Sequence, residues 1–309
     1  MDKVNFNDAF YLKLGKQGMW EDELNHGKKA RIGWTNIATE DIQNENWSII
    51  KERIDQDFNE RGKKTGATQD FNALKSFCNA TDKDIFITFF DGKLYWCFLD
   101  NSKVQQDEFS KYRATKVSWS CTDINGRPLY VNQISGKISK TQGFRATLCK
   151  IDEKDSLLRL INGESSPIVE QLKLKKIELN NCLQSAFSDL HWKDCEVLTD
   201  LIFRQSGWRR LSLMGENMKY IDLELIDPIT KDLFQVQVKA SADVKDFEDY
   251  AERFTGKGYR KLFFVVYNQN SSLLNYRHNY DNVQLLTGSD LADLIIDLGL
   301  TNWIIDKIS

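Results

Sequence analysis

The last third of the chain contains four residues whose types and order could do chemistry together: Glu196, Asp222, Gln237 and Lys239. Carboxylate and amide oxygens are suitable ligands for a hard cation such as Mg²⁺, with Mn²⁺ as the alternative ion. Such a cation polarises a phosphoryl oxygen and lowers the pKa of a bound water. A lysine beside it can orient or deprotonate that water and offset the charge that develops on phosphate. These residue types therefore suit the hydrolysis of a phosphodiester bond.

The alternation of side chains along two strand-like stretches predicts that three of these residues converge. Residues two apart in a strand share a face and lie about 6.8 Å apart. Asp222 then shares a face with Glu224. On the next strand Gln237 shares a face with Lys239, opposite the aliphatic Val238. A solvated strand face is the alternative interpretation, because an Asp followed by Gln-x-Lys occurs by chance in many sheets.

The elements that must position these residues alternate between helices and strands. The sequence predicts a helix over 187–205, strands over 220–226 and 233–239, a helix over 243–254, strands over 261–267 and 283–287, and a helix over 289–298. The nearly continuous apolar run of the third strand is typical of the buried centre of a sheet. This order predicts a mixed sheet flanked by helices.

The order of the four residues, with Gln-Val-Lys at 237–239, resembles the PD-(D/E)XK nuclease superfamily and looks most like the Mrr-type restriction endonucleases. The resemblance covers about residues 185–306. It implies that Asp222 and Gln237 contact a metal ion, that Glu196 supports it as a third metal residue, and that Lys239 acts on the attacking water. It also implies DNA as the partner and a homodimer that cuts two strands.

Two departures from the family pattern keep an inactive nucleic-acid-binding protein open as an alternative. The approach to Asp222 contains one glycine, Gly215, where the family often has several. At the metal-binding position of the second strand this chain has Gln237 in place of Glu. A neutral amide is a weaker ligand than a carboxylate. Glu196 or Glu224 could therefore carry more of the metal binding.

The first half of the chain is predicted to be a small β-rich domain, either a partly closed barrel or a curved sheet with one or two helices. The Asp-Gly pair at 91–92 separates two aromatic-rich runs and predicts a hairpin. Other strands are expected at 9–14, 30–34, 117–121, 129–131 and 146–151, and a helix over 41–61. The fold class is thus α+β or α/β. We expect a sensor or recognition domain over 1–152, a linker and bridging helix over 153–184, and the nuclease domain over 185–309.

Two tryptophans next to glycines are candidates for the rim of a base-binding pocket. Trp20 follows the loop from Gly15 to Gly18, and Trp34 follows Gly33. Aromatic side chains can stack on an extruded or single-stranded base, although packing in the core is the alternative for each. This half faintly resembles the PUA-like and EVE-like modules, which implies recognition of a modified base. A nucleotide messenger that switches the nuclease on is a further alternative.

Three other residues are candidates for contact with nucleic acid. Arg209 and Arg210 follow Trp208 and could contact a phosphate backbone, with ordinary solvated charges as the alternative. His278 lies in a polar aromatic stretch and could touch nucleic acid, with a simple surface loop as the alternative.

Composition excludes several classes of protein. The net charge is −3, and from Ser185 onward 14 Lys and Arg stand against 19 Asp and Glu, a net charge of −5. Binding to nucleic acid must then use local patches or metal ions rather than overall charge. The six cysteines form no CxxC pair, so reduced, buried thiols are expected. No apolar run approaches the roughly 20 residues that cross a bilayer, and we expect a cytoplasmic protein without a membrane partner.

Overall fold

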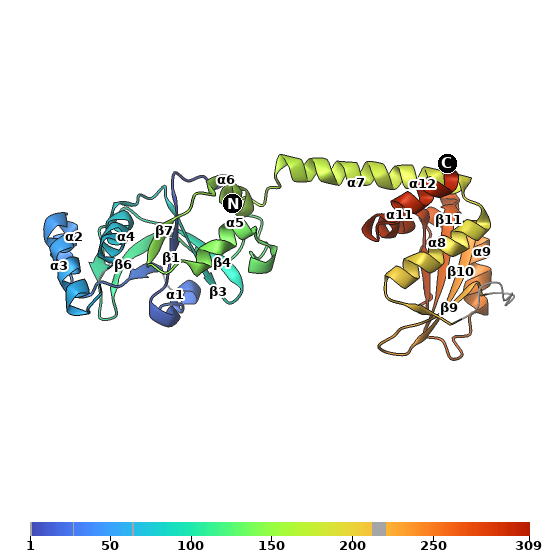
Figure 1. Ribbon diagram of the computed structural model, residues 1–309, viewed down its shortest axis with the longest axis horizontal. Coiled ribbons are helices and arrows are strands. Elements are labelled where there is room, and N and C mark those ends of the chain that lie inside the picture. The colour runs from blue at the N-terminus through green and yellow to red at the C-terminus, as the bar shows by residue number, and fades with distance from the viewer. Residues whose placement is uncertain (1, 27, 64, 212–220) are drawn as a thin grey trace. The chain divides into compact units, whose positions relative to one another are not determined.

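The computed structural model describes residues 2–26, 28–63, 65–211 and 221–309 of the chain. The chain divides into two compact units, Met1–Pro167 and Ile168–Ser309, and each is built around a sheet of its own (Figure 1). The predicted α+β class is confirmed, with a curled half-barrel sheet in the first unit and a five-stranded mixed sheet in the second.

The sheet of the first unit has seven strands in the order β2-β6-β4-β3-β1-β7, with β5 paired to β6. Its strands are β1 (Ala9–Leu12), β2 (Lys29–Ile32), β3 (Ile85–Phe90), β4 (Lys93–Leu99), β5 (Gln105–Gln106), β6 (Lys111–Ser120) and β7 (Leu148–Lys150). The predicted Asp-Gly hairpin joins β3 to β4, and Asp91 and Gly92 both have positive φ, as this turn requires. The strands β1 and β3 are parallel, and the other pairs are antiparallel.

Helices cover both faces of this sheet, so its central strands are apolar on both sides. In β4, Cys97 faces one core with α3 and α4, whereas Trp96 faces another core with α5 and α6. The helices of the unit are α1 (Glu23–His26), α2 (Thr39–Gln43), α3 (Trp47–Glu60), α4 (Ala67–Asn79), α5 (Gly136–Ser139) and α6 (Lys154–Ile161), and the 3₁₀ turns are η1 (Lys16–Gly18), η2 (Val131–Gln133) and η3 (Lys140–Gly143).

Three predicted segments of the first half differ in the structure. The helix expected over 41–61 is broken into α2 and α3 at residues 44–46, where Glu45 has a positive φ. The strand expected at 129–131 gives only an isolated bridge from Tyr130 to Lys93, followed by η2. The start of the expected linker at 153 forms α6, whose Leu157 and Ile161 are fully buried in the second of the two cores. Side chains four residues apart in a helix lie on the same face. Leu157 and Ile161 are spaced in this way, so the apolar face of α6 packs onto the first unit.

The sheet of the second unit has the order β12-β11-β10-β9-β8. Its strands are β8 (Arg209–Arg210), β9 (Leu223–Ile226), β10 (Leu233–Ala242), β11 (Lys261–Gln269) and β12 (Val283–Leu286). The pairs β8–β9 and β9–β10 are antiparallel, whereas β10–β11 and β11–β12 are parallel. The mixed sheet predicted from the sequence is therefore present, with β11 between two partners as its apolar run indicates.

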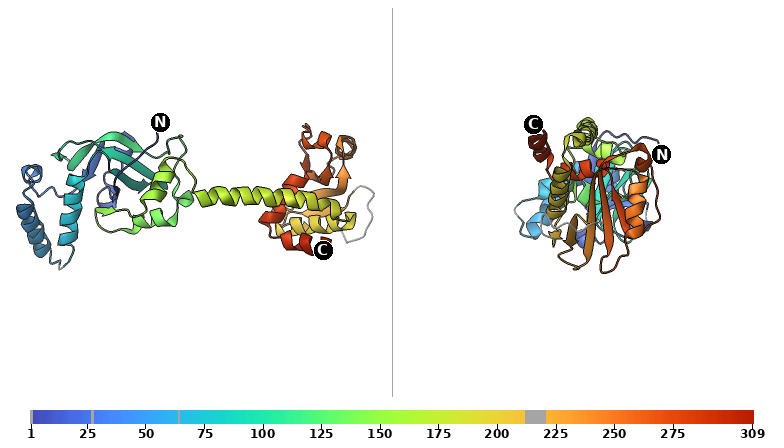
Figure 2. Two further views of the ribbon diagram at one scale, coloured as in Figure 1. Left: turned by 90° about the horizontal axis from the view of Figure 1, so that it is seen from above. Right: turned by 90° about the vertical axis from the view of Figure 1, so that its right-hand side faces the viewer.

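Helices pack on both faces of this sheet as well, with α8 on one face and α9 on the other (Figures 1 and 2). The helices are α7 (Pro167–Ala186), α8 (Trp192–Gln205), α9 (Val244–Arg253), α10 (Ser271–Leu274), α11 (Gly288–Asp297) and α12 (Thr301–Ile308), with η4 (Phe187–Asp189) before α8. The helix predicted over 187–205 is broken at His191, which precedes α8 and accepts a hydrogen bond from the Lys193 N–H. Among the described residues no helix is long and apolar enough to cross a bilayer.

Candidate active site

The hairpin of β9 and β10 brings Asp222 onto Gln237. Asp222 directly precedes β9, and its backbone N–H donates to the carbonyl of Val236 at 3.0 Å. The Asp222 carboxylate accepts hydrogen bonds through Oδ2 from the Val238 N–H, at 2.6 Å, and from the Gln237 side-chain amide. The antiparallel register, with Val236 opposite Leu223, fixes this arrangement. The predicted convergence of the acid and the amide is present in the structure.

Gln237 is buried, with 4% of its surface exposed; β11 pairs beside it, and α9 packs on the face of the sheet that contains its partner Phe264. Its Oε1 atom has no hydrogen-bond partner among the described residues. An unpaired buried polar atom costs about 1–3 kcal/mol. An amide oxygen of this kind, next to a carboxylate, matches the all-oxygen donors that a hard divalent cation prefers. These two side chains therefore fit a Mg²⁺ or Mn²⁺ ion.

Burial raises the pKa of the Asp222 carboxyl above its usual value. The hydrogen bond from Val238 and the positive charge of Lys239 oppose this rise without cancelling it. Lys239 is half-buried, and its Nζ lies 4.9 Å from the centre of the Tyr250 ring on α9. A cation over an aromatic face is attracted by the ring quadrupole. The lysine is thus held near Asp222, on the face of β10 that strand alternation predicts.

Glu196 approaches the same place from α8. Its carboxyl is half-buried, and burial raises its pKa, with the neighbouring charge of Asp222 adding to the rise. Arg210 and Lys193 act in the opposite direction. A carboxyl whose pKa is raised by a neighbouring carboxylate lies in a negative potential, and a cation is attracted to such a place. Glu196 therefore lies close enough to Asp222 for the two charges to interact.

Glu224, which strand alternation places on the same face as Asp222, forms its hydrogen bond with Tyr259. It is half-buried, and Tyr259 donates its hydroxyl proton to the Glu224 Oε1. This hydrogen bond raises the pKa of Tyr259. In the described part of the chain, no three Asp, Glu, His or Cys side chains gather where they could hold a metal ion. A metal site at the β9–β10 hairpin would therefore need a ligand besides these carboxylates, and the Gln237 amide is the neighbouring candidate.

The structure separates the two arginines of β8. Arg210 Nη1 lies 3.6 Å from Oδ1 of Asp200, a carboxyl that is 1% exposed, while Arg204 Nη2 lies 2.6 Å from its Oδ2. Arg210 thus compensates a buried charge. Arg209 is exposed, so of the two it is the one accessible to a phosphate backbone. Asp200 and Tyr250 were not predicted from the sequence, because their partners lie far away in the chain.

His278 and the approach to Asp222 are two further predicted features. The His278 ring packs against Phe247 with 4.9 Å between ring centres, and its Nδ1 accepts a hydrogen bond from the Tyr280 N–H at 3.3 Å. The histidine is half-buried in this aromatic cluster rather than displayed on an open loop. Gly215 lies outside the described residues.

Trp34, one of the two candidate tryptophans of the first unit, lines a cavity. Trp34 has φ 56°, in the left-handed region, and lines a space of about 170 Å³. A bulky residue in that region costs about 1–3 kcal/mol, and such strain often marks a ligand site. Trp20 is half-buried, and both tryptophans pack against the core on the α3 and α4 side of the sheet.

Comparison with known proteins gives a distant likeness to a solved structure. No known protein-family model matches the chain, and no curated protein matches its sequence. Among solved structures, the MspJI restriction endonuclease in complex with a 27-mer oligonucleotide matches with a TM-score of 0.28 and 11% identity, covering 79% of this chain and 68% of that chain. A TM-score this low does not establish a shared fold, so what is said below of function depends on the geometry of the side chains.

Proposed function

We propose that this protein is a metal-dependent DNA endonuclease of the restriction or phage-defence type, with its active site at the β9–β10 hairpin. The observation that supports this most is the buried, unpaired Oε1 of Gln237 beside the Asp222 carboxylate. Folding alone gives no reason to bury an amide oxygen without a partner. An oxygen-binding cation at this place satisfies it.

In the proposed reaction the residues of the chain have separate tasks. Asp222 and Gln237 hold the cation through oxygen, and Glu196 contributes negative charge from α8. When bound, the cation polarises the phosphoryl oxygen and lowers the pKa of a water. Lys239 orients the attacking water and offsets negative charge on the phosphate. Tyr250 holds the Lys239 ammonium over its ring.

The first unit has the complementary role of deciding where the second unit cuts. Its half-barrel sheet carries a strained aromatic residue at a cavity, a feature that suits recognition of a base in DNA. Recognition of a modified base or another DNA feature by this unit is part of the proposal.

The test is cleavage of plasmid, genomic and phage DNA by the purified chain with Mg²⁺ or Mn²⁺. Asp222→Ala and Lys239→Ala should each lower the cleavage rate by about 100-fold or more, since each removes a group that acts in the transition state. Asp249→Asn and Lys261→Ala are matched controls, because Asp249 is an exposed acid on α9 and Lys261 starts β11. Both controls should cleave like the unchanged chain. The enzymatic function is refuted if the active-site variants and the unchanged chain behave alike on every substrate.

A further inference from the structure

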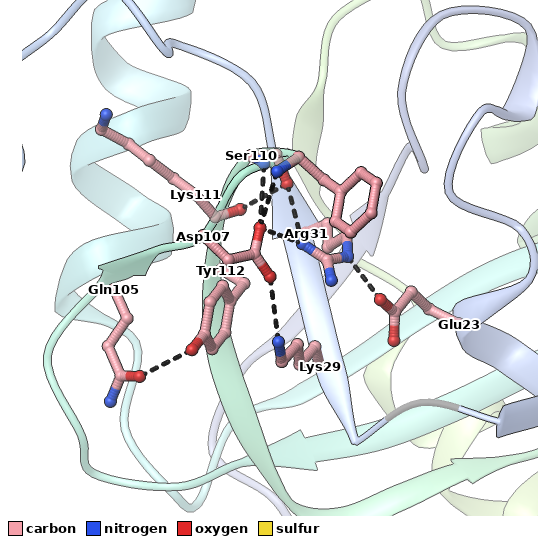
Figure 3. A network of polar contacts seen from close by, with 9 residues as sticks. Glu23, Lys29, Arg31, Gln105, Asp107, Ser110, Lys111 and Tyr112 are labelled. Carbon is pink, nitrogen blue, oxygen red and sulfur yellow. Dashed lines mark hydrogen bonds and ion pairs between the residues drawn. The ribbon is translucent and has the colours of Figure 1, made fainter.

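The two edges of the sheet in the first unit differ in how they are protected. Among the described residues, β2 pairs with β6 alone and β7 pairs with β1 alone, so these two strands form the edges. The β2 edge carries two cations, Lys29 and Arg31, and Asp107 binds each of them at 2.9 Å (Figure 3). Glu23 accepts a further hydrogen bond from Arg31. Charged side chains on an edge strand keep other strands from pairing with it.

The β7 edge, in contrast, leaves backbone groups unpaired. The Lys13 N–H donates to the Thr147 carbonyl at 2.8 Å, which shows that the backbone of residue 147 faces β1. In an antiparallel pair, alternate residues direct their backbone groups to opposite sides. Leu148 and Lys150 therefore direct their N–H and C=O groups away from β1, and no described residue forms a hydrogen bond with these four groups.

A groove of about 950 Å³ lies along this edge, between β7 and α4. Ligand pockets typically measure about 300–1,000 Å³. The α4 wall of the groove presents amides, hydroxyls and one lysine: Thr68, Gln69, Asn72, Lys75, Ser76 and Asn79. Its apolar part includes Phe10, Ala73 and Leu148, which belong to one core. Amide and hydroxyl groups both donate and accept hydrogen bonds, so this wall suits a ligand that has amides of its own.

The charged residues that line the groove balance one another, because two are acids and two are lysines. Asp8 accepts a hydrogen bond from Lys150 Nζ at 2.9 Å, and Asp84 is 7% exposed. Lys75 Nζ lies 5.5 Å from the centre of the Trp47 ring. Binding of nucleic acid draws on lysines and arginines that neutralise several phosphates. A groove without net charge therefore favours an uncharged backbone, such as that of a peptide, over a nucleic acid.

We propose that this groove binds an extended segment of a partner protein, which adds to the sheet as a strand beside β7. The backbone of the segment pairs with the outward N–H and C=O groups of Leu148 and Lys150. An apolar side chain of the segment packs on Phe10 and Leu148, and neutral polar side chains meet the amides of α4. Strand addition of this kind takes its affinity from main-chain hydrogen bonds and its specificity from alternate side chains. The proposal concerns the first unit alone and does not depend on cleavage of DNA.

The experiment uses the full-length chain in EDTA, without DNA, and a library of short random peptides displayed on phage as the probe. Selected peptides are synthesised, and their affinities are measured by fluorescence anisotropy. Hydrogen–deuterium exchange is then read at single residues with and without peptide. Exchange at the N–H groups of Leu148 and Lys150 should slow when peptide binds, because both groups become hydrogen-bonded. The N–H of Cys149 already faces β1 and should change less.

Two variants of Lys150 separate its backbone from its side chain. Lys150→Ala and Lys150→Pro both remove the ammonium that bonds to Asp8, but only proline also removes the outward N–H. An edge strand tolerates proline in this orientation. Affinity for the selected peptides should be about tenfold lower in Lys150→Pro than in Lys150→Ala, since one hydrogen bond is lost and the ring obstructs the edge.

A second pair of variants tests the wall of the groove. Asn72→Arg places a long charged side chain in the groove and should also weaken binding by about tenfold, as an unpaired charge at an interface does. Gln56→Arg is the matched control, because Gln56 is exposed on α3 and does not line this groove. It should bind the peptides like the unchanged chain. If Lys150→Pro does not fold, Asn72→Arg and the exchange data decide the result.

Four outcomes would overturn the proposal. The first is a library from which no peptide binds the unchanged chain. The second is equal affinity for the selected peptides within each pair of variants. The third is binding that leaves exchange at Leu148 and Lys150 unchanged. The fourth is displacement of the peptides by a single-stranded oligonucleotide, which would assign the groove to nucleic acid. Because neither metal nor substrate DNA is present, a failure of the cleavage test leaves these results unaffected.

Discussion

The Asp222 carboxyl is buried in a place where its negative charge destabilises the folded chain. Its raised pKa means that the folded chain keeps a proton where the unfolded chain has already lost it. Stability from this group is therefore greatest below the ordinary aspartate pKa of 3.8, falls as the pH rises through the folded value, and stays lower above it. An asparagine at position 222 does not ionise, so it would not make the stability depend on pH in this way.

We therefore expect Asp222→Asn to raise the melting temperature of the metal-free chain at pH 7.5 and to change it less at pH 4. Asp227 is the control, because hydrogen bonds from the Thr230 and Ile229 N–H groups lower its pKa. Its ionised form is the stabilising one, so Asp227→Asn should not raise the melting temperature at pH 7.5. Thermal melts at both pH values, with EDTA, measure the difference. A lower melting temperature for Asp222→Asn at pH 7.5 would contradict the account.

At the same scale, the sequence predicts some parts of the site and not others. Strand alternation correctly places Asp222 against Gln237 and puts Lys239 on the same face of β10. It does not predict that Gln237 is buried, because alternation alone cannot show that α9 covers that face. Nor does it show that Arg210 is bound to Asp200, since this pairing depends on how β8 packs against α8.

At the scale of elements, local patterns were sufficient where an element is long or is marked by a turn. The β3–β4 hairpin, β10 and β11 follow from apolar runs and an Asp-Gly turn. Short elements such as α5 and α6 are stabilised by packing rather than by propensity, so the sequence around them resembles a loop. The break at His191 depends on a side-chain hydrogen bond that hydrophobic periodicity does not reveal.

The close packing of α11 on β11 gives a prediction about an element. A Cβ atom at Gly288, the first residue of α11, would lie 2.6 Å from the backbone carbonyl oxygen of Tyr267. Gly288→Ala should therefore force the helix away from the strand and cost about 1–3 kcal/mol, as overpacking does. Gly136→Ala is the matched control, because Gly136 also starts a helix and has open space around it.

Hydrogen–deuterium exchange reports on each sheet separately and suits this comparison. Amides of β11 should exchange faster in Gly288→Ala, whereas Gly136→Ala should leave the exchange of its own unit close to that of the unchanged chain. Equal protection of β11 in Gly288→Ala and in the unchanged chain would show that α11 can shift without cost.

At the scale of the whole molecule, each unit has its own hydrophobic cores, and among the described residues no core includes members from both units. The fragments 1–167 and 168–309 should therefore each fold when produced separately. We expect 168–309 to cleave DNA with Mg²⁺ on its own. Circular dichroism of both fragments and the cleavage assay above measure this. An unfolded 168–309 fragment would show that the second unit depends on the first.

The connectivity of the second sheet also has a consequence for the order in which the chain folds. The β9–β10 hairpin joins residues close in sequence, whereas the parallel β10–β11 pair must wait for the crossover through α9. Loop closure over a longer span makes parallel pairing the slower step. The contact between Asp222 and Gln237 lies within the hairpin, so it can form early, while water still reaches it. The site becomes dry only when the later strands dock, and refolding should restore the hairpin before it restores the buried environment of its carboxyl.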